Sequence, residues 1–156
     1  MDATYHVILA EDHLRFREEL KKILNGIPEV EIVAETGEGN EFFNHLENLK
    51  PDLVILDIFM PNLRAMKATR EIKAKYPEVK VIIMAMDNES EYLAQAVAAG
   101  ADGMVLKQNS AMDLELAVQK MRQGEKYFPY YPEEKTSDAD SFPANNPRYL
   151  TFQPIC

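Results

Sequence analysis

Short apolar runs rich in β-branched residues alternate along the chain with segments of helical spacing, and this alternation limits the possible folds more than any other feature. Within the helical segments, apolar residues recur every three or four positions, as Leu20 and Leu24 do. One face of each segment can therefore pack against a sheet. The apolar runs are each of strand length and lie at residues 7–10, 30–34, 53–56, 79–85 and 104–106.

A strict strand-then-helix order with nearly continuous apolar strands predicts a parallel sheet that is covered by helices on both faces. Five such units fit a single doubly wound α/β domain of the flavodoxin-like kind, with the strand order 2-1-3-4-5. In that order a site forms beyond the carboxyl ends of the strands, near the switch between the first and third strands. The residues that follow those two strands are therefore the first candidates for function.

The composition of the chain changes after Gly124. Residues 127–156 contain no glycine and five of the nine prolines. We therefore expect a domain over residues 1–126, followed by an irregular tail or linker over residues 127–156. The aromatic start of that tail, residues 127–132, is expected to dock on the domain itself rather than on a partner.

Charged residues follow three of the predicted strands. Glu11 and Asp12 follow the first strand, Asp57 the third and Lys107 the fifth, so the fold would bring all four to one edge of the sheet. Neighbouring carboxylates raise one another's pKa unless a cation is present, and an oxygen-rich pocket suits Mg²⁺. Asp57 can then attack phosphorus while Mg²⁺ and Lys107 offset charge on the phosphoryl oxygens. The pattern predicts a magnesium-dependent aspartyl phosphate site.

Three stretches of the chain resemble the signature regions of response regulator receiver domains. They are VILAEDH at 7–13, DLVILDIFMP at 52–61 and AGADGMVLK at 99–107. The resemblance covers roughly residues 5–125 and implies a CheY-like fold. An acidic pair followed by histidine, together with Gln108 after the lysine, is most similar to the NarL/FixJ group of regulators.

The resemblance also assigns roles to individual residues. It implies that Asp57 is the phosphoacceptor and that Lys107 contacts the phosphoryl group. It makes Asp57, Asp12 and the backbone carbonyl of Phe59 ligands of Mg²⁺, with Glu11 supporting the metal through water. A sensor histidine kinase would supply the phosphoryl group, and a homodimer through the fourth helix, fifth strand and fifth helix is the expected mode of self-association.

The chain departs from the family at two switch positions. Receiver domains usually carry Thr or Ser at the end of the fourth strand and an aromatic residue on the fifth, where this chain has Ala85 and Met104. Alanine cannot donate a hydrogen bond to a phosphoryl group, and methionine has no ring or hydroxyl. Altered switching and variation without effect both remain open. A phosphorylation-independent interaction module is therefore the alternative hypothesis.

Several classes of function fit the sequence poorly. A net charge of −9 argues against nucleic-acid binding by this chain. No apolar run is long enough to cross a bilayer and no export signal is visible, so we expect a cytoplasmic protein. A phosphate-handling enzyme would need a second acidic motif or an acid/base histidine, and neither accompanies Asp57.

Overall fold

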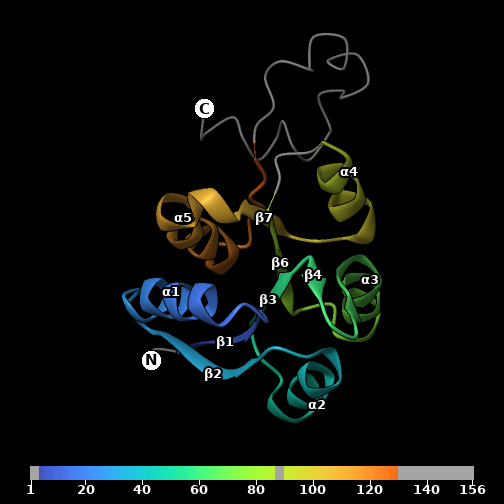
Figure 1. The fold of residues 1–156 in the computed structure, drawn as a ribbon, viewed down its shortest axis with the longest axis horizontal. Helices are drawn as coiled ribbons and strands as arrows, with labels where there is room; N and C mark the ends of the chain where they lie inside the picture. Colours follow the sequence, from blue (N-terminus) through green and yellow to red (C-terminus); the bar gives the residue numbers. More distant parts are fainter. Residues whose placement is uncertain (1–3, 87–89, 130–156) are drawn as a thin grey trace, which may run out of the picture.

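A five-stranded parallel sheet in the order β2-β1-β3-β6-β7 forms the centre of the protein (Figure 1). The structure is a computed structural model that describes residues 4–86 and 90–129. Counted along this sheet alone, the order is 2-1-3-4-5, which confirms the predicted topology. The strands are β1 (Tyr5–Ala10), β2 (Val30–Thr36), β3 (Leu53–Asp57), β6 (Lys80–Ala85) and β7 (Gly103–Leu106).

Helices cover both faces of the sheet, as predicted (Figure 1). On one face lie α1 (Leu14–Asn25) and α5 (Ser110–Arg122), which pack Leu20, Leu24 and Leu114 against the strands. A short 3₁₀ turn, η1 (Lys107–Asn109), leads into α5. The other face carries α2 (Gly39–Leu49), α3 (Ala65–Lys75) and α4 (Ser90–Ala99).

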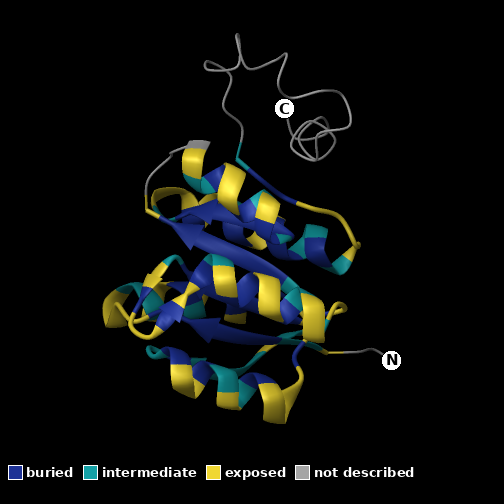
Figure 2. Cartoon of the chain, turned by 90° about the vertical axis from the view of Figure 1, so that its right-hand side faces the viewer, coloured by how far each residue is buried: buried dark blue, intermediate teal, exposed yellow. Residues whose placement is uncertain are grey.

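The sheet separates two hydrophobic cores, one under each helical layer. The central strand β3 is buried along its whole length, which explains its unbroken apolar run. In Figure 2 most residues of the sheet are buried, although the edge strand β2 is largely intermediate, whereas the outer faces of the helices are exposed. Among the described helices, none has the length and apolar character that a membrane span requires.

A small antiparallel hairpin of β4 (Phe59–Met60) and β5 (Leu63–Arg64) follows β3 and was not predicted. Asn62, at its turn, has φ of +58°. The backbone N–H of Gly39 donates to the carbonyl of Pro61 at 3.0 Å, and the Asn62 amide donates to the Glu38 carboxylate at 2.6 Å. A Cβ on Gly39 would lie 1.9 Å from the Asn62 carbonyl oxygen, so only glycine fits. The hairpin is therefore held against the first turn of α2.

The chain after α5 returns to the edge of the sheet at β7. The Tyr127 N–H donates to the Asp102 carbonyl at 3.0 Å, and the Met104 N–H donates to the Tyr127 carbonyl at 2.8 Å. The side chains of Tyr127 and Phe128 are both buried. Residues 130–156 lie outside the described part of the chain, so the division into domain and tail stays a prediction.

Candidate functional site

The carboxyl ends of adjacent strands bring the predicted acidic residues together. Glu11 and Asp12 directly follow β1, and Asp57 is the last residue of β3, which pairs with β1. Carboxylate oxygens of these three residues lie within 4.8 Å of one another. Lys107 follows β7, and its Nζ lies 3.1 Å from Asp57 Oδ1. The four predicted side chains therefore share one site.

The acidic residues differ in their exposure to solvent. Glu11 and Asp57 are 0% and 2% exposed, whereas Asp12 is exposed. Lys107 Nζ also lies 3.3 Å from Glu11 Oε1. Within the described structure, both buried carboxylates therefore contact the same ammonium group. Buried charges are costly unless they are paired. With three carboxylates to one ammonium, the site keeps an excess of negative charge.

The electrostatic environment raises the pKa of Asp57 to about 7. Burial is the largest cause because it disfavours the charged carboxylate, and the neighbouring Glu11 carboxylate acts in the same direction. The Lys107 ammonium partly opposes this rise. A group that favours ionised Asp57, such as a bound cation, would lower this pKa.

Backbone hydrogen bonds orient both buried carboxylates. The N–H of His13 donates to Glu11 Oε2 at 3.0 Å, and the N–H of Phe59 donates to Asp57 Oδ1 at 3.3 Å. Glu11 Oε1 is buried and accepts no hydrogen bond from any described residue, although the Lys107 ammonium lies 3.3 Å from it. Three carboxylates, two of them buried and facing a single ammonium, form an oxygen-only donor set that fits a hard cation such as Mg²⁺.

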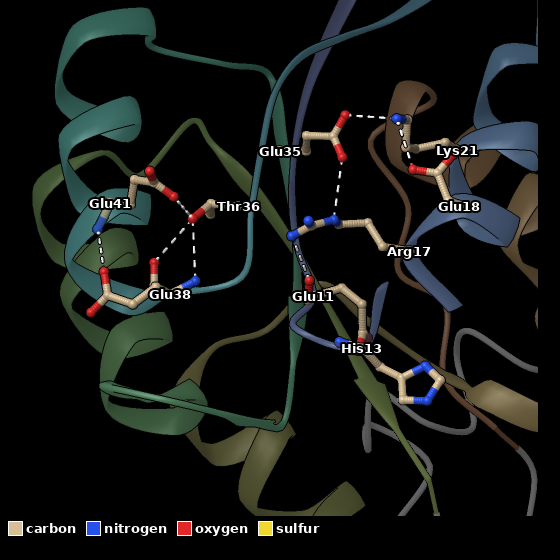
Figure 3. A network of polar contacts seen from close by, with 9 residues as sticks. All are labelled: Glu11, His13, Arg17, Glu18, Lys21, Glu35, Thr36, Glu38 and Glu41. Atoms are coloured by element: carbon tan, nitrogen blue, oxygen red, sulfur yellow. Dashed lines mark hydrogen bonds and ion pairs between the residues drawn. The ribbon is translucent and has the colours of Figure 1, made fainter. Parts of the chain in front are cut away.

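Arg17 of α1 supports the turn that carries Glu11 and Asp12 (Figure 3). Its Nη1 donates to the backbone carbonyl of Glu11 at 2.9 Å, and its Nε lies 3.2 Å from the Glu35 carboxylate on β2. Lys21 contacts the same Glu35 carboxylate at 2.8 Å but has no contact with Glu11. Arg17 was not singled out in the sequence, because a bond to a backbone carbonyl leaves no pattern of residue types.

The site opens into a hollow with an apolar rim. Leu14, Phe59 and Met86 are exposed by 61%, 61% and 57%, although exposed side chains of this size are usually polar. They line the same hollow as Asp57 and Lys107. An apolar rim around a charged centre is a surface that another protein can cover.

The two departures from the family pattern lie on β6 and β7. Ala85 is the last residue of β6, and the residue before it, Met84, pairs with Asp57 across the sheet. Met104 is on β7 and pairs with Ile83. Both Ala85 and Met104 are fully buried. Neither side chain brings a hydroxyl to this part of the structure.

A doubly wound sheet with an acidic cluster and a lysine at its carboxyl edge fits the architecture of a two-component signalling receiver. The family model of the response regulator receiver domain matches residues 7–119. The chain therefore belongs to the response regulator receiver domain family.

Similar proteins are regulators of the LuxR/NarL kind. Transcriptional regulatory protein DegU of Brevibacillus brevis is 35% identical over 121 residues, which cover 78% of this chain and 51% of DegU. Response regulator protein VraR of Staphylococcus aureus (strain NCTC 8325 / PS 47) is 33% identical over 125 residues, which cover 80% of this chain and 60% of VraR. The chain thus spans only 51% to 60% of the length of these relatives.

Solved structures show the same fold. The non-phosphorylated receiver domain of RcsB from Escherichia coli has a TM-score of 0.76 and 28% identity, covering 81% of this chain and 99% of that one. A DNA-binding response regulator of the LuxR family from Staphylococcus aureus has a TM-score of 0.70 and 31% identity, covering 75% of this chain and 98% of that one.

Proposed function

We propose that this receiver accepts a phosphoryl group on Asp57 from the phosphohistidine of a sensor histidine kinase. The observation that carries the proposal is the convergence of Glu11, Asp12 and Asp57 within 4.8 Å, with Lys107 Nζ 3.1 Å from the acceptor oxygen Oδ1. The exposed apolar rim formed by Leu14 and its neighbours suits the docking of a kinase around the site. A cytoplasmic location for this exchange stays a prediction.

The reaction would transfer the phosphoryl group from nitrogen to oxygen. A carboxylate oxygen of Asp57 forms the new P–O bond while the P–N bond to the donor histidine breaks, and the histidine leaves as a neutral imidazole after taking up a proton. Lys107 is placed to neutralise charge on a phosphoryl oxygen, and its ammonium is held 5.0 Å from the centroid of the Phe16 ring.

Mg²⁺ is the expected cofactor. Asp12, Asp57 and the backbone carbonyl of Phe59 would hold it, and Glu11 would support it through water. When bound, it would offset the negative charge of the carboxylates and the phosphoryl group. The three carboxylates within 4.8 Å of one another, two of which contact a single ammonium, support this assignment.

Phosphorylation would regulate association with a partner or with a second copy of the chain through α4, β7 and α5. Met112 and Leu116 of α5 are 79% and 40% exposed and would supply apolar contact area. Because Ala85 has no hydroxyl and Met104 is buried, we infer that this receiver switches by a route other than a hydroxyl contact to the phosphoryl group.

A phosphorylation-independent interaction module is the second candidate. Ala85 and Met104 favour it, because a receiver fold with an apolar switch region can bind partners without a phosphate-driven change. Direct binding of nucleic acid by this chain is not proposed, because its net charge is −9.

Intact-mass spectrometry after incubation with acetyl phosphate distinguishes these candidates. The wild-type chain is expected to gain one phosphoryl group with Mg²⁺, but not with EDTA, and Asp57→Asn should gain none. Light scattering of the same samples reports association. A phosphorylated chain whose association is unchanged favours the interaction module, whereas a folded wild-type chain that gains no phosphoryl group refutes the acceptor proposal.

A further inference from the structure

A row of exposed cations borders a groove between α3 and α4. Arg64, Lys67 and Arg70 follow one another at intervals of three residues and are all exposed, in a chain whose net charge is −9. Lys67 has a weak contact of 4.0 Å with Glu71. Within residues 4–86 and 90–129, Arg64 and Arg70 have no ion pair or hydrogen bond that would neutralise them. Two guanidinium groups are therefore available to a ligand.

The floor of the same groove is apolar and aromatic. Phe59 and Tyr92 lie edge to face with their ring centroids 5.9 Å apart, and Phe59 is 61% exposed. The groove has a volume of ≈ 710 Å³. A partly exposed aromatic pair beside arginines that have no ion pair in the described structure combines residue types that contribute strongly to protein recognition. The remaining apolar lining comes from Ile58, Met60, Leu63, Ala65 and Met66.

We propose that this groove, lined by Phe59, Arg64, Lys67, Arg70 and Tyr92, binds an acidic peptide segment of a protein partner. Arginine is suited to this role because its planar guanidinium pairs with a carboxylate through two parallel hydrogen bonds. An apolar side chain of the same segment would contact the aromatic pair. The footprint shares α4 with the face of α4, β7 and α5 proposed for phosphorylation-dependent association, but its cations come from β5 and α3.

Charge favours an acidic peptide over a nucleic acid as the occupant. A nucleic acid presents a long, regular array of phosphates, and binding depends on many cations along its path. Here three cations stand on one short stretch of a strongly acidic chain. A short peptide with a few carboxylates matches this local charge and leaves the rest of the acidic surface out of contact.

The groove is joined to the phosphorylation site through Phe59. Its side chain lies in the groove, and its N–H donates to Asp57 Oδ1 at 3.3 Å. A segment that fixes Phe59 would therefore change the affinity of the site for Mg²⁺, and Mg²⁺ would change the affinity for the segment by the same factor. Only this coupling rests on the proposed function, because the groove itself does not require phosphorylation.

Fluorescence anisotropy tests the proposal. The probe is a fluorescein-labelled pool of 16-residue peptides that contain Glu, Asp, Phe and Leu in random order. The wild-type chain should bind this pool more tightly than a matched pool built with Lys and Arg, and more weakly as salt is raised. Arg64→Glu combined with Arg70→Glu should lower the affinity at least tenfold. Arg15→Glu with Lys22→Glu makes the same change of charge on exposed α1 positions and should change it less than twofold.

Three results would overturn docking in the groove. The first is equal affinity for the acidic and the basic peptide pools. The second is an equal loss of peptide affinity in the two double variants, with both melting at the wild-type temperature. The third is binding of a dT16 oligonucleotide as tight as that of the acidic pool. The coupling has its own test, because Mg²⁺ should shift the peptide affinity at least twofold in the wild type but not in Asp57→Asn. Peptide binding by metal-free Asp57→Asn would keep the groove proposal intact even if the phosphoacceptor proposal failed.

Discussion

The pocket at Asp57 and the strands β6 and β7, which carry Ala85 and Met104, differ in chemical character. The pocket concentrates charge, with buried carboxylates against the Lys107 ammonium. The adjoining parts of β6 and β7 are apolar and fully buried. Accepting a phosphoryl group depends on the charges, whereas transmitting the change depends on side chains in the neighbouring strands. The comparison indicates that acceptance and transmission can be separated in this receiver, and the following experiments test that separation.

Loss of the lysine should have the largest effect on acceptance. Lys107→Ala removes the ammonium that lies 3.1 Å from Asp57 Oδ1. The rate of phosphorylation by acetyl phosphate should fall about 100-fold, which is the usual effect of removing a preorganised hydrogen-bond donor from an active site. Intact-mass time courses measure the rate. Lys120→Ala, on α5, removes a lysine whose ion pair in the described structure is with Glu125, and this variant should react at the wild-type rate. A Lys107→Ala rate near that of the wild type would remove this residue from the chemistry.

Arg17 should affect the metal rather than the acceptor directly. Arg17→Ala frees the Glu11 carbonyl and should weaken Mg²⁺ binding by about tenfold, the effect expected for a residue that orients ligands. Isothermal titration with Mg²⁺ measures this. Lys21→Ala loses a contact to the same Glu35 carboxylate without touching Glu11 and should leave Mg²⁺ affinity unchanged. Equal losses in the two variants would point to a general disturbance of α1.

The raised pKa of Asp57 predicts how stability depends on pH in metal-free protein. Folding raises this pKa from 3.8 to about 7, so the folded state binds the proton more tightly than the unfolded state. Stability from this group is full below pH 3.8 and is lost as pH rises through about 7. In EDTA, Asp57→Asn should therefore raise Tm by a few degrees at pH 8 and by less at pH 5. A gain that does not vary with pH would contradict the proposed cause.

A hydroxyl at the switch position should change transmission with the smallest effect on acceptance. Ala85→Thr places an oxygen beside the residue that pairs with Asp57, and the rate of phosphorylation should stay within about twofold of the wild type. Light scattering should show a larger change in association upon phosphorylation. Ala85→Val adds a β-branched side chain of similar shape without a hydroxyl. If both variants behave alike, side-chain volume rather than hydrogen bonding controls the switch.

The strand order and the meeting of Glu11, Asp12, Asp57 and Lys107 could be predicted, because the carboxyl ends of parallel strands lie at one edge. The apolar runs were long enough to indicate strands, and their alternation with helical segments indicated that the strands run parallel.

Other features could not be predicted for physical reasons. The hairpin of β4 and β5 has two residues in each strand, too few to produce an alternating pattern. The bond from Arg17 to the Glu11 carbonyl uses backbone that every residue type possesses. The groove beside Arg64 forms only where α3 and α4 meet, so no single stretch of sequence encodes it.

The segment after α5 that pairs with β7 also protects the protein from aggregation through the edge of its sheet. An exposed edge strand is a template for pairing with another sheet, and proteins block such edges in several ways. At β2 the edge carries the charged residues Glu31 and Glu35, whereas at β7 the hydrogen bonds with Tyr127 occupy part of the edge. Cutting the chain before Tyr127 would uncover that part of β7 and would remove the buried side chains of Tyr127 and Phe128 from the two hydrophobic cores. Such a shortened receiver is expected to aggregate through its sheet edge during storage.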